Sequence, residues 1–276
     1  MNGSVSQGLQ DLRLHRIFRA LEITAGTYVE LGFPAVLASN TECLRRTGAW
    51  TGVRFDGRCL KDAAENAENG CHKAWITSDN IVALLRSHHV SESVTYVSID
   101  LDTTDLWVLR ALLGGGYRPA VLSVEYNSNY PLDYWIAFPD DPAVRWDGDC
   151  FMGSSAGAVA AVATEFGYAV VDVEPGLDLF LVDRQRWGGR PVPSLSTGAV
   201  FRPFNIRRNR TGLAHARRSR QLVDYREVPP QSWFATPCHG TPGLWNAGVG
   251  LSIQASRSGG AARRFLARDL NVRTAF

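Results

Sequence analysis

Short apolar runs alternate with helix-like segments along the first two thirds of the chain. Seven such runs, each ended by polar residues or glycine, are 27–31, 51–55, 72–76, 94–99, 119–126, 168–173 and 177–182. The segments between them that show helical spacing are 40–46, 79–87, 104–113 and 155–166. Because the runs are apolar on both faces, the pattern predicts a parallel sheet covered by helices on both sides.

The two ends of this pattern refine the predicted topology. Leucines and an isoleucine spaced among charged residues over 9–21 predict an amphipathic helix that leads into the sheet. Only Glu174-Pro175-Gly176 separates the last two runs, which is too short for a crossover helix and predicts an antiparallel hairpin. We therefore expect an α/β fold: a doubly wound, seven-stranded, mostly parallel sheet that closes with a hairpin.

The regular pattern is lost after Asp183, where glycine and proline punctuate the chain. Charge changes at the same place. Residues 1–183 carry 13 Lys+Arg and 24 Asp+Glu, whereas residues 184–276 carry 16 arginines, no lysine and 3 acids. This asymmetry predicts an α/β domain over 1–183 and an irregular, Arg-rich and poorly ordered appendage over 184–276.

The appendage contains a cluster of arginines that suggests a partner. Its members are Arg207, Arg208, Arg210, Arg217, Arg218 and Arg220. Such a cluster can neutralise phosphates, which favours a nucleic-acid or other acidic partner. Two alternatives stay open: a solvated basic tail, and a tail that folds back on the acidic domain.

Cysteine usage and the absence of long apolar runs limit the class of protein. The five cysteines form no CxxC pair and are odd in number, which argues against a disulfide framework and a zinc ribbon. No apolar run approaches the ~18 residues of a membrane span. The N-terminal residues lack an uninterrupted apolar segment, so we expect a soluble cytoplasmic protein without a membrane partner.

Acidic residues and glycines follow the first two predicted strands. Glu30-Leu31-Gly32 ends the first strand, and Phe55-Asp56-Gly57 ends the second. An acid at the second strand end is placed to bind ribose hydroxyls, and a small residue lets the backbone approach a ligand. This pattern is consistent with a nucleoside-containing cofactor. The alternative is that Glu30 and Asp56 are solvated acids at strand ends.

Two later strand ends are richer in polar side chains. The fourth strand is followed by Asp100, Asp102 and Asp105, and the fifth ends at Glu125 and Asn127. Ligands of open α/β sheets bind at the carboxyl ends of strands. We therefore expect these side chains to converge on one substrate or one hard cation.

A structural interpretation covers part of this set. Asp102 or Thr103 can cap a helix that starts near Thr104, with Asp105 in its first turn. Helix capping does not explain Glu125 and Asn127 at the end of the next strand.

Together these motifs resemble a known family. The stretch IDLDTTDLWVLRAL followed by RPAVLSVEYN is similar to the signature of FkbM-type methyltransferase-like proteins. TYVELGF, SNTECL and AWTGVRFDG resemble the family's first two strands, and GSSAGAVAAVATEFGYAVVDVEPGLDLFLV resembles its closing helix and hairpin. The resemblance covers about 27–183. It implies a class I methyltransferase-like domain within 1–183 that depends on S-adenosylmethionine (AdoMet).

The resemblance also implies roles for individual residues. The residues that would line the AdoMet site are Glu30, Gly32, Asp56 and Asp100. The resemblance implies O-methylation of a small-molecule or glycan-like hydroxyl acceptor, with Asp100 or Asp102 as the catalytic base and Glu125 and Asn127 facing the acceptor. Asp100, Glu125 and Asn127 also resemble the Mg²⁺ ligands of catechol-type O-methyltransferases. Because the loop after Gly32 is short and apolar, a non-catalytic methyltransferase-like binding module is the second hypothesis.

One further motif belongs to a different chemistry. Residues 153–157 read GSSAG and match the G-x-S-x-G nucleophile elbow of hydrolases. Asp172 or Asp178, followed by His215, would complete a triad in the right order. However, only three apolar residues precede the motif, which is short for the strand of an elbow. Ser154 or Ser155 is better explained as a helix N-cap.

Overall fold

The computed structural model describes residues 5–33, 38–57, 63–128, 130, 132, 135–146 and 152–200, with the backbone of four short strands beyond residue 219. The arginines at 207–218 and His215 lie outside the described residues. No helix in the described ranges combines the length and apolar character that crossing a membrane requires.

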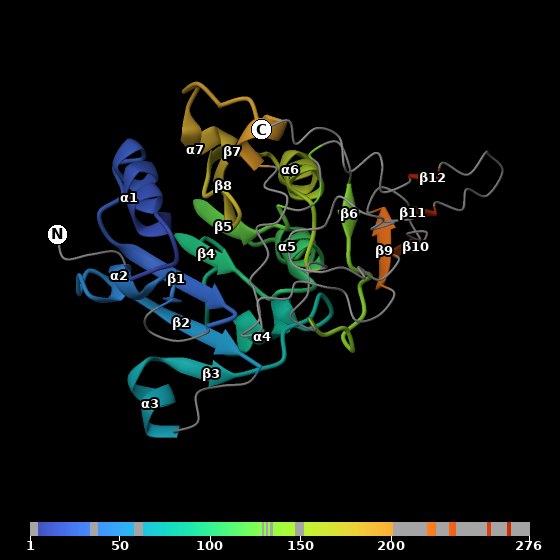
Figure 1. Cartoon of the computed structure of the whole chain (residues 1–276). Helices are drawn as coiled ribbons and strands as arrows, with labels where there is room; N and C mark the ends of the chain where they lie inside the picture. The colour runs from blue at the N-terminus through green and yellow to red at the C-terminus, as the bar shows by residue number, and fades with distance from the viewer. Residues whose placement is uncertain are drawn as a thin grey trace.

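The centre of the molecule is a seven-stranded sheet in the order β3-β2-β1-β4-β5-β8-β7 (Figure 1). Its strands are β1 (Gly26–Leu31), β2 (Trp50–Asp56), β3 (Cys71–Lys73), β4 (Tyr96–Ile99), β5 (Val121–Glu125), β7 (Tyr168–Val173) and β8 (Asp178–Asp183). All pairs are parallel except those of β8, which runs antiparallel to both β5 and β7. The predicted doubly wound sheet with its closing hairpin is confirmed, and the fold is of the α/β methyltransferase-like class.

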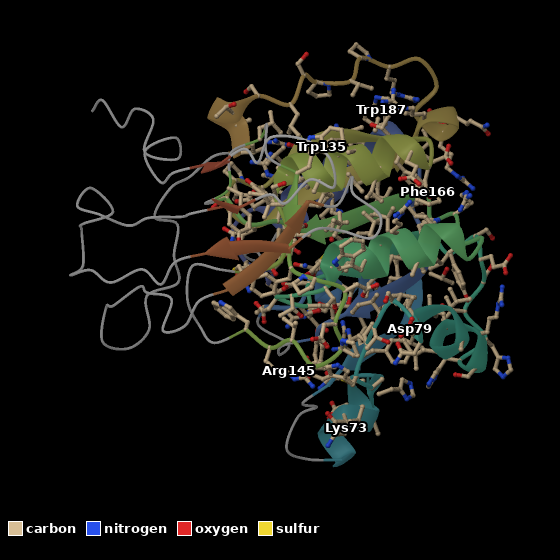
Figure 2. The ribbon with its side chains drawn as sticks, turned by 90° about the vertical axis from the view of Figure 1, so that its right-hand side faces the viewer. Lys73, Asp79, Trp135, Arg145, Phe166 and Trp187 are labelled. Carbon is tan, nitrogen blue, oxygen red and sulfur yellow. The ribbon has the colours of Figure 1, made fainter. Side chains whose placement is uncertain are left out.

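Helices cover both faces of this sheet. Figure 1 shows α1 (Gln10–Ala20) and α2 (Glu42–Arg45) on one side, and α4 (Ile81–Ser87), α5 (Asp105–Gly114) and α6 (Ala156–Glu165) on the other. The short α3 (Ala63–Glu68) precedes β3. Figure 2 shows Trp135 and Phe166 at opposite ends of α6. Each helical segment predicted from apolar spacing overlaps one of these helices.

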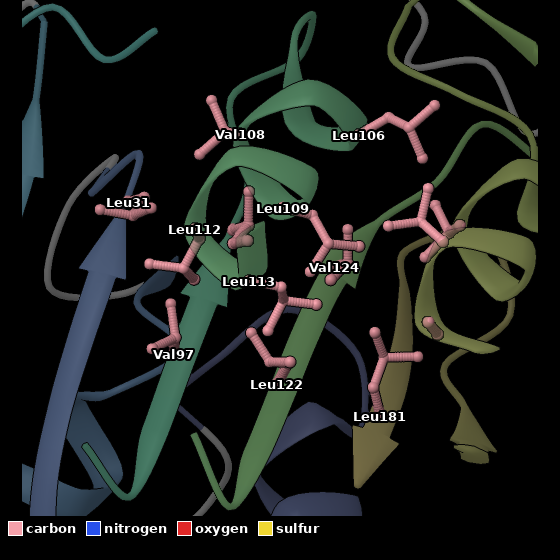
Figure 3. Close-up of a cluster of buried hydrophobic side chains, with 14 of the residues drawn as sticks. Leu31, Val97, Leu106, Val108, Leu109, Leu112, Leu113, Leu122, Val124 and Leu181 are labelled. Carbon is pink, nitrogen blue, oxygen red and sulfur yellow. The ribbon is translucent and has the colours of Figure 1, made fainter. Parts of the chain in front are cut away.

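The face beneath α4, α5 and α6 is packed with aliphatic side chains (Figure 3). Leu109, Leu112 and Leu113 of α5 are fully buried against Val97 and Leu122 of the sheet. Burying a leucine or valine side chain contributes about 1.5–3 kcal/mol. This face therefore accounts for much of the hydrophobic stabilisation of the domain.

The opposite face departs from the predicted apolar character. Arg54 of β2, Glu30 of β1, Ser98 of β4 and Ser123 of β5 lie side by side in the strand register and are buried. This polar row crosses four strands beneath α1 and α2. The expectation that the strands are apolar on both faces is wrong here, because each strand carries one polar residue at the matching position.

The chain packs on the domain beyond the expected boundary at Asp183. After α7 (Arg184–Trp187), α8 (Thr197–Val200) places Val200 in the main apolar core, where its side chain is fully buried. The Tyr126 hydroxyl donates a hydrogen bond to the Val200 carbonyl at 3.1 Å. A loosely packed appendage therefore does not start directly after Asp183. The remaining division into domains stays a prediction.

Several short strands were not predicted, because they have only two to five residues. They are β6 (Ile136–Ala137), β9 (Arg220–Asp224), β10 (Ser232–Ala235), β11 (Ile253–Gln254) and β12 (Arg264–Phe265). The β6 strand pairs antiparallel with β9, which pairs with β10. The backbone at 220–224 is thus joined to a segment that lies between β5 and α6 in the sequence.

Candidate functional site

Gly32 stands where the strand order reverses, between β1 and β4. Its φ is +88°, and a Cβ added there would lie 1.7 Å from the Asp100 carbonyl oxygen, so no other residue fits. The Gly32 amide donates to the Phe55 carbonyl at 2.8 Å, and the Asp100 amide donates to the Leu31 carbonyl at 3.0 Å. The carboxyl ends of β1, β2 and β4 therefore meet at the point where open α/β sheets bind ligands.

Three carboxylates converge beside this point. Oxygens of Asp100, Asp102 and Glu125 lie within 4.8 Å of one another. Asp102 has a left-handed backbone with φ +64°, uncommon for a residue other than glycine, and its carbonyl accepts the Gly153 amide at 3.0 Å. The predicted convergence of acids from the ends of β4 and β5 is confirmed, whereas their chemical roles remain predictions.

Glu125 is the buried member of this acid cluster. Burial raises the pKa of Glu125 well above its ordinary value, and the neighbouring charges of Asp100 and Asp102 raise it further. Its Oε2 atom has no hydrogen-bond partner among the described residues. A carboxylate in this position is stabilised by a cation or by a bound proton.

Asp105, in the first turn of α5, is a further buried carboxyl group near the acid cluster. Its Oδ1 atom accepts the Leu101 amide at 2.6 Å, and burial raises the pKa of Asp105 to about 7. The helix N-cap is Thr104, which makes no side-chain capping bond. The expectation that Asp102 or Thr103 is the N-cap is therefore wrong, whereas Asp105 does lie in the first turn of α5 as expected.

Asn127 follows Glu125 but is oriented by a different segment. Its backbone amide donates to the Ser154 carbonyl at 2.7 Å, and its side-chain nitrogen donates to the Met152 carbonyl at 3.0 Å. The residue is 2% exposed. Its side-chain nitrogen thus faces residues 152–154, of which Gly153 also donates its amide to the Asp102 carbonyl.

Glu30 is engaged by its own chain. Its carboxylate accepts the Ser39 hydroxyl at 2.7 Å, the Asn40 amide at 2.8 Å and the Thr41 hydroxyl at 2.5 Å. Arg54 Nε lies 3.3 Å from the same carboxylate. Burial raises the pKa of Glu30, while Arg54 and these donors oppose that shift. The observed contacts anchor the segment after the first loop to β1.

Arg54 and Glu42 are functional candidates that the sequence did not single out. Arg54 is fully buried and donates to Glu42 at 3.1 Å. Burial would raise the pKa of Glu42, but hydrogen bonds from Arg45, Arg46 and Arg54 outweigh it and lower the pKa to about 2. The sequence feature that could have predicted this buried ion pair is a single arginine inside an apolar strand run, because a buried charge needs a partner.

Asp56 ends β2 and is partly exposed, as a ribose-binding acid requires. The next residue, Gly57, is constrained by Trp75, since an added Cβ would lie 2.5 Å from the indole ring. Arg145 stacks its guanidinium 3.5 Å above the same ring, and Figure 2 shows Arg145 and Lys73 toward the same side of the molecule. A bulky aromatic residue therefore stands beside the predicted ribose position.

The GSSAG segment forms a helix start. Ser155 is the N-cap of α6, with an extended backbone, and its hydroxyl accepts the Ala158 amide at 3.2 Å. The predicted N-cap is confirmed. The residue that would serve as triad base, His215, lies outside the described residues.

The comparisons with known proteins give distant likenesses. No family model and no curated protein matches the sequence. Among solved structures, the chain is similar to the N-terminal domain of EvdMO1 with SAH (S-adenosylhomocysteine) bound, at 17% identity and TM-score 0.41, covering 65% of this chain and 82% of that one. It is also similar to an O-methyltransferase family protein from Burkholderia thailandensis, at 16% identity and TM-score 0.37, covering 64% and 57%. A third is the MycE methyltransferase in complex with Mg, SAH and mycinamycin VI, at 14% identity and TM-score 0.40, covering 67% and 51%. Likeness at this level assigns no activity and no ligand to this chain.

Proposed function

We propose that this protein is an AdoMet-dependent methyltransferase of the FkbM type that methylates a hydroxyl oxygen of a small-molecule or glycan-like acceptor. The observation that carries the proposal is the convergence of Asp100, Asp102 and Glu125 within 4.8 Å, beside a glycine that is sterically required at the switch point of the sheet. Acids held this close repel each other, and a substrate, cation or proton relieves that repulsion.

The proposed chemistry is an in-line displacement. Bound AdoMet would supply the methyl carbon to the acceptor oxygen and would leave as SAH. The hydroxyl proton passes to a carboxylate, for which the partly exposed Asp100 and Asp102 are the candidates. Asp56 would bind the ribose hydroxyls, and the main contribution to rate would be the positioning of the two reactants.

The acid cluster also fits a divalent cation. Carboxylate oxygens are the ligands that Mg²⁺ prefers, and Asp100, Asp102 and Glu125 would supply them. Asn127 would be a further ligand through its side-chain oxygen. A bound Mg²⁺ would lower the pKa of the acceptor hydroxyl.

Calorimetric titration with AdoMet and SAH, with and without Mg²⁺, tests the proposal directly. Asp56→Ala should weaken binding by about ten- to hundredfold, since it removes a hydrogen bond to a charged group. The exposed Asp79→Ala is the matched control and should bind as wild type does. Absence of binding at millimolar cofactor would contradict the proposal.

A second variant tests the role of the acid cluster. Asp100→Asn should abolish methyl transfer while leaving the fold intact, and the melting temperature should rise slightly because repulsion is reduced. If the cation proposal is right, Mg²⁺ will raise the melting temperature of wild type and leave that of the variant unchanged. Equal transfer rates in both proteins would remove Asp100 from the mechanism.

A second candidate function is a non-catalytic methyltransferase-like binding module. The family resemblance assigns the Glu30 carboxylate to AdoMet binding. In the structure this carboxylate already accepts hydrogen bonds from residues 39–41 and pairs with Arg54, which favours the second candidate. Cofactor titration separates the two candidates, because a module without catalysis is expected to show no AdoMet binding.

A further inference from the structure

A set of buried side chains joined by hydrogen bonds lies next to the acid cluster, on the face of the sheet covered by α1. Gln10, the first residue of α1, donates from its side-chain nitrogen to Asp178 Oδ2 at 2.7 Å. The Asn40 side-chain nitrogen donates to the same oxygen at 3.4 Å and to Ser98 at 3.0 Å. Asp178 is directly opposite Glu125 in the antiparallel pair of β5 and β8. Residues far apart in the sequence thus meet at one end of β5.

Three oxygens of this group lack donors. Gln10 Oε1, Asn40 Oδ1 and Glu125 Oε2 are buried and have no hydrogen-bond partner within the described part of the chain. Their residues are 4%, 5% and 4% exposed. Both amide nitrogens are directed at Asp178 Oδ2, so both amide oxygens point away from that carboxyl group. With Glu125 ionised, the three oxygens left over are all acceptors.

We propose that Gln10, Asn40, Asp178 and Glu125 form a subsite for a primary ammonium group. An ammonium group presents three N–H donors and no acceptor, which matches three acceptor oxygens without donors. Its positive charge also offsets the carboxylates of Asp178 and Glu125. A water molecule would bring two donors and no charge, and an anion would add repulsion. Buried polar groups in native proteins are nearly always satisfied, so an acceptor-only group indicates a donor-rich ligand.

Two ligands can bring an ammonium group here. One is the amino group of the AdoMet methionine part, in which case the inference rests on the proposed function. The other is an amine carried by the acceptor substrate. Both share the same chemistry and differ in which molecule supplies it, so they are separable by choice of probe.

The first arm of the test compares SAH with 5′-methylthioadenosine, which lacks the amino-acid part. Gln10→Met keeps the length of the side chain and removes the amide. It should weaken SAH binding at least about tenfold, as loss of a hydrogen bond to a charged group does, and change methylthioadenosine binding less than about threefold. Gln185→Met, at an exposed residue of α7, is the control and should change neither.

The second arm tests an amine by itself. Ethanolamine should raise the melting temperature of wild type more than ethylene glycol does, and this difference should vanish in Gln10→Met. Dependence on Gln10 in the first arm assigns the subsite to the cofactor, and dependence in the second arm alone assigns it to the acceptor. Absence of dependence on Gln10 in both arms, or an equal loss of SAH and methylthioadenosine binding, would overturn the inference.

The two proposals fail in different ways. If wild type binds no SAH, the proposed function fails, while the ethanolamine arm still decides whether an ammonium group binds. If Gln10→Met does not fold, Asn40→Leu replaces it, because it removes the second unpartnered amide oxygen and keeps the Asn40 backbone bond to Glu30. The same outcomes are expected for that variant.

Discussion

The two faces of the central sheet are built on different physical principles. Under α4, α5 and α6 the strands present aliphatic side chains that pack with α5 residues such as Leu112. Under α1 and α2 they present the polar row of Arg54, Glu30, Ser98 and Ser123. The first face is stabilised in proportion to the apolar area it buries. The second combines an apolar cluster around Phe18, Trp50 and Tyr96 with buried charges, and an unpaired buried charge is strongly destabilising.

The difference also marks where function is located. The polar face continues at its carboxyl end into Glu125 and Asp178, beside Asp100 and Asp102. The apolar face has no such continuation in the described core cluster. We infer that the apolar face mainly stabilises the fold. The polar face is less stabilising because it buries charges, and it holds those charges in position near the candidate site.

The largest expected effect is that of Arg54→Ala on the polar face. The substitution leaves the buried carboxylates of Glu30 and Glu42 without their shared cation, which should lower the free energy of unfolding by about 3–5 kcal/mol. Urea denaturation measures this loss. Arg110→Ala is the control, because its partly exposed ion pair with Glu165 should contribute less than about 1 kcal/mol. Equal losses in both variants would erase the distinction between the faces.

On the apolar face, Leu112→Ala should lower the free energy of unfolding by about 2–5 kcal/mol through lost burial and the cavity left behind. Leu9→Ala, at a residue that is 51% exposed, provides the comparison and should have little effect. AdoMet affinity should not change in folded Leu112→Ala protein. A large loss of affinity would mean that the apolar face also positions the site.

The extent of the apolar face can be tested by shortening the chain. A protein ending after Asp183 loses the burial of Val200, whereas one ending after Val200 retains it. We expect a difference of at least about 1.5–3 kcal/mol in the free energy of unfolding, because Val200 is fully buried and Trp187, Leu195 and Ala199 also pack on the two clusters. Equal melting temperatures of the two shortened proteins would show that residues 184–200 add nothing to the core.

The polar face should also make the stability of the protein depend on pH. Burial raises the pKa of Asp178 from 3.8 to about 7, so the folded state holds this proton more tightly than the unfolded state does. The resulting stability is fully present below about pH 4 and is lost as pH rises through about 7. Its slope is at most about 1.4 kcal/mol per pH unit.

Asp178→Asn removes this titration. We expect the free energy of unfolding of wild type to fall relative to that of the variant between pH 4 and 7. Leu112→Ala should keep the wild-type pH profile, since it removes no titrating group. Parallel profiles for wild type and Asp178→Asn would show that the carboxylate stays ionised when buried.

The elements that depend on local periodicity could be predicted from the sequence. Apolar runs ended by glycine or polar residues mark strands, and the short Glu174-Pro175-Gly176 link forces an antiparallel hairpin. The N-cap at Ser155 was also predictable, because capping joins residues only three positions apart. The acids at the ends of β4 and β5 were found for a similar reason, since parallel strands present their carboxyl ends at one edge.

Contacts between polar residues on different elements could not be predicted, because they depend on how the elements pack. Glu30 and Arg54 meet because β1 and β2 pair in a given register, and a shift of one residue would move each side chain to the other face. Gln10 and Asp178 lie 168 positions apart and meet only when α1 docks on the sheet. Periodicity along the chain identifies an element and its buried face, but contacts across the sheet are set by strand pairing and helix packing, which no local pattern encodes.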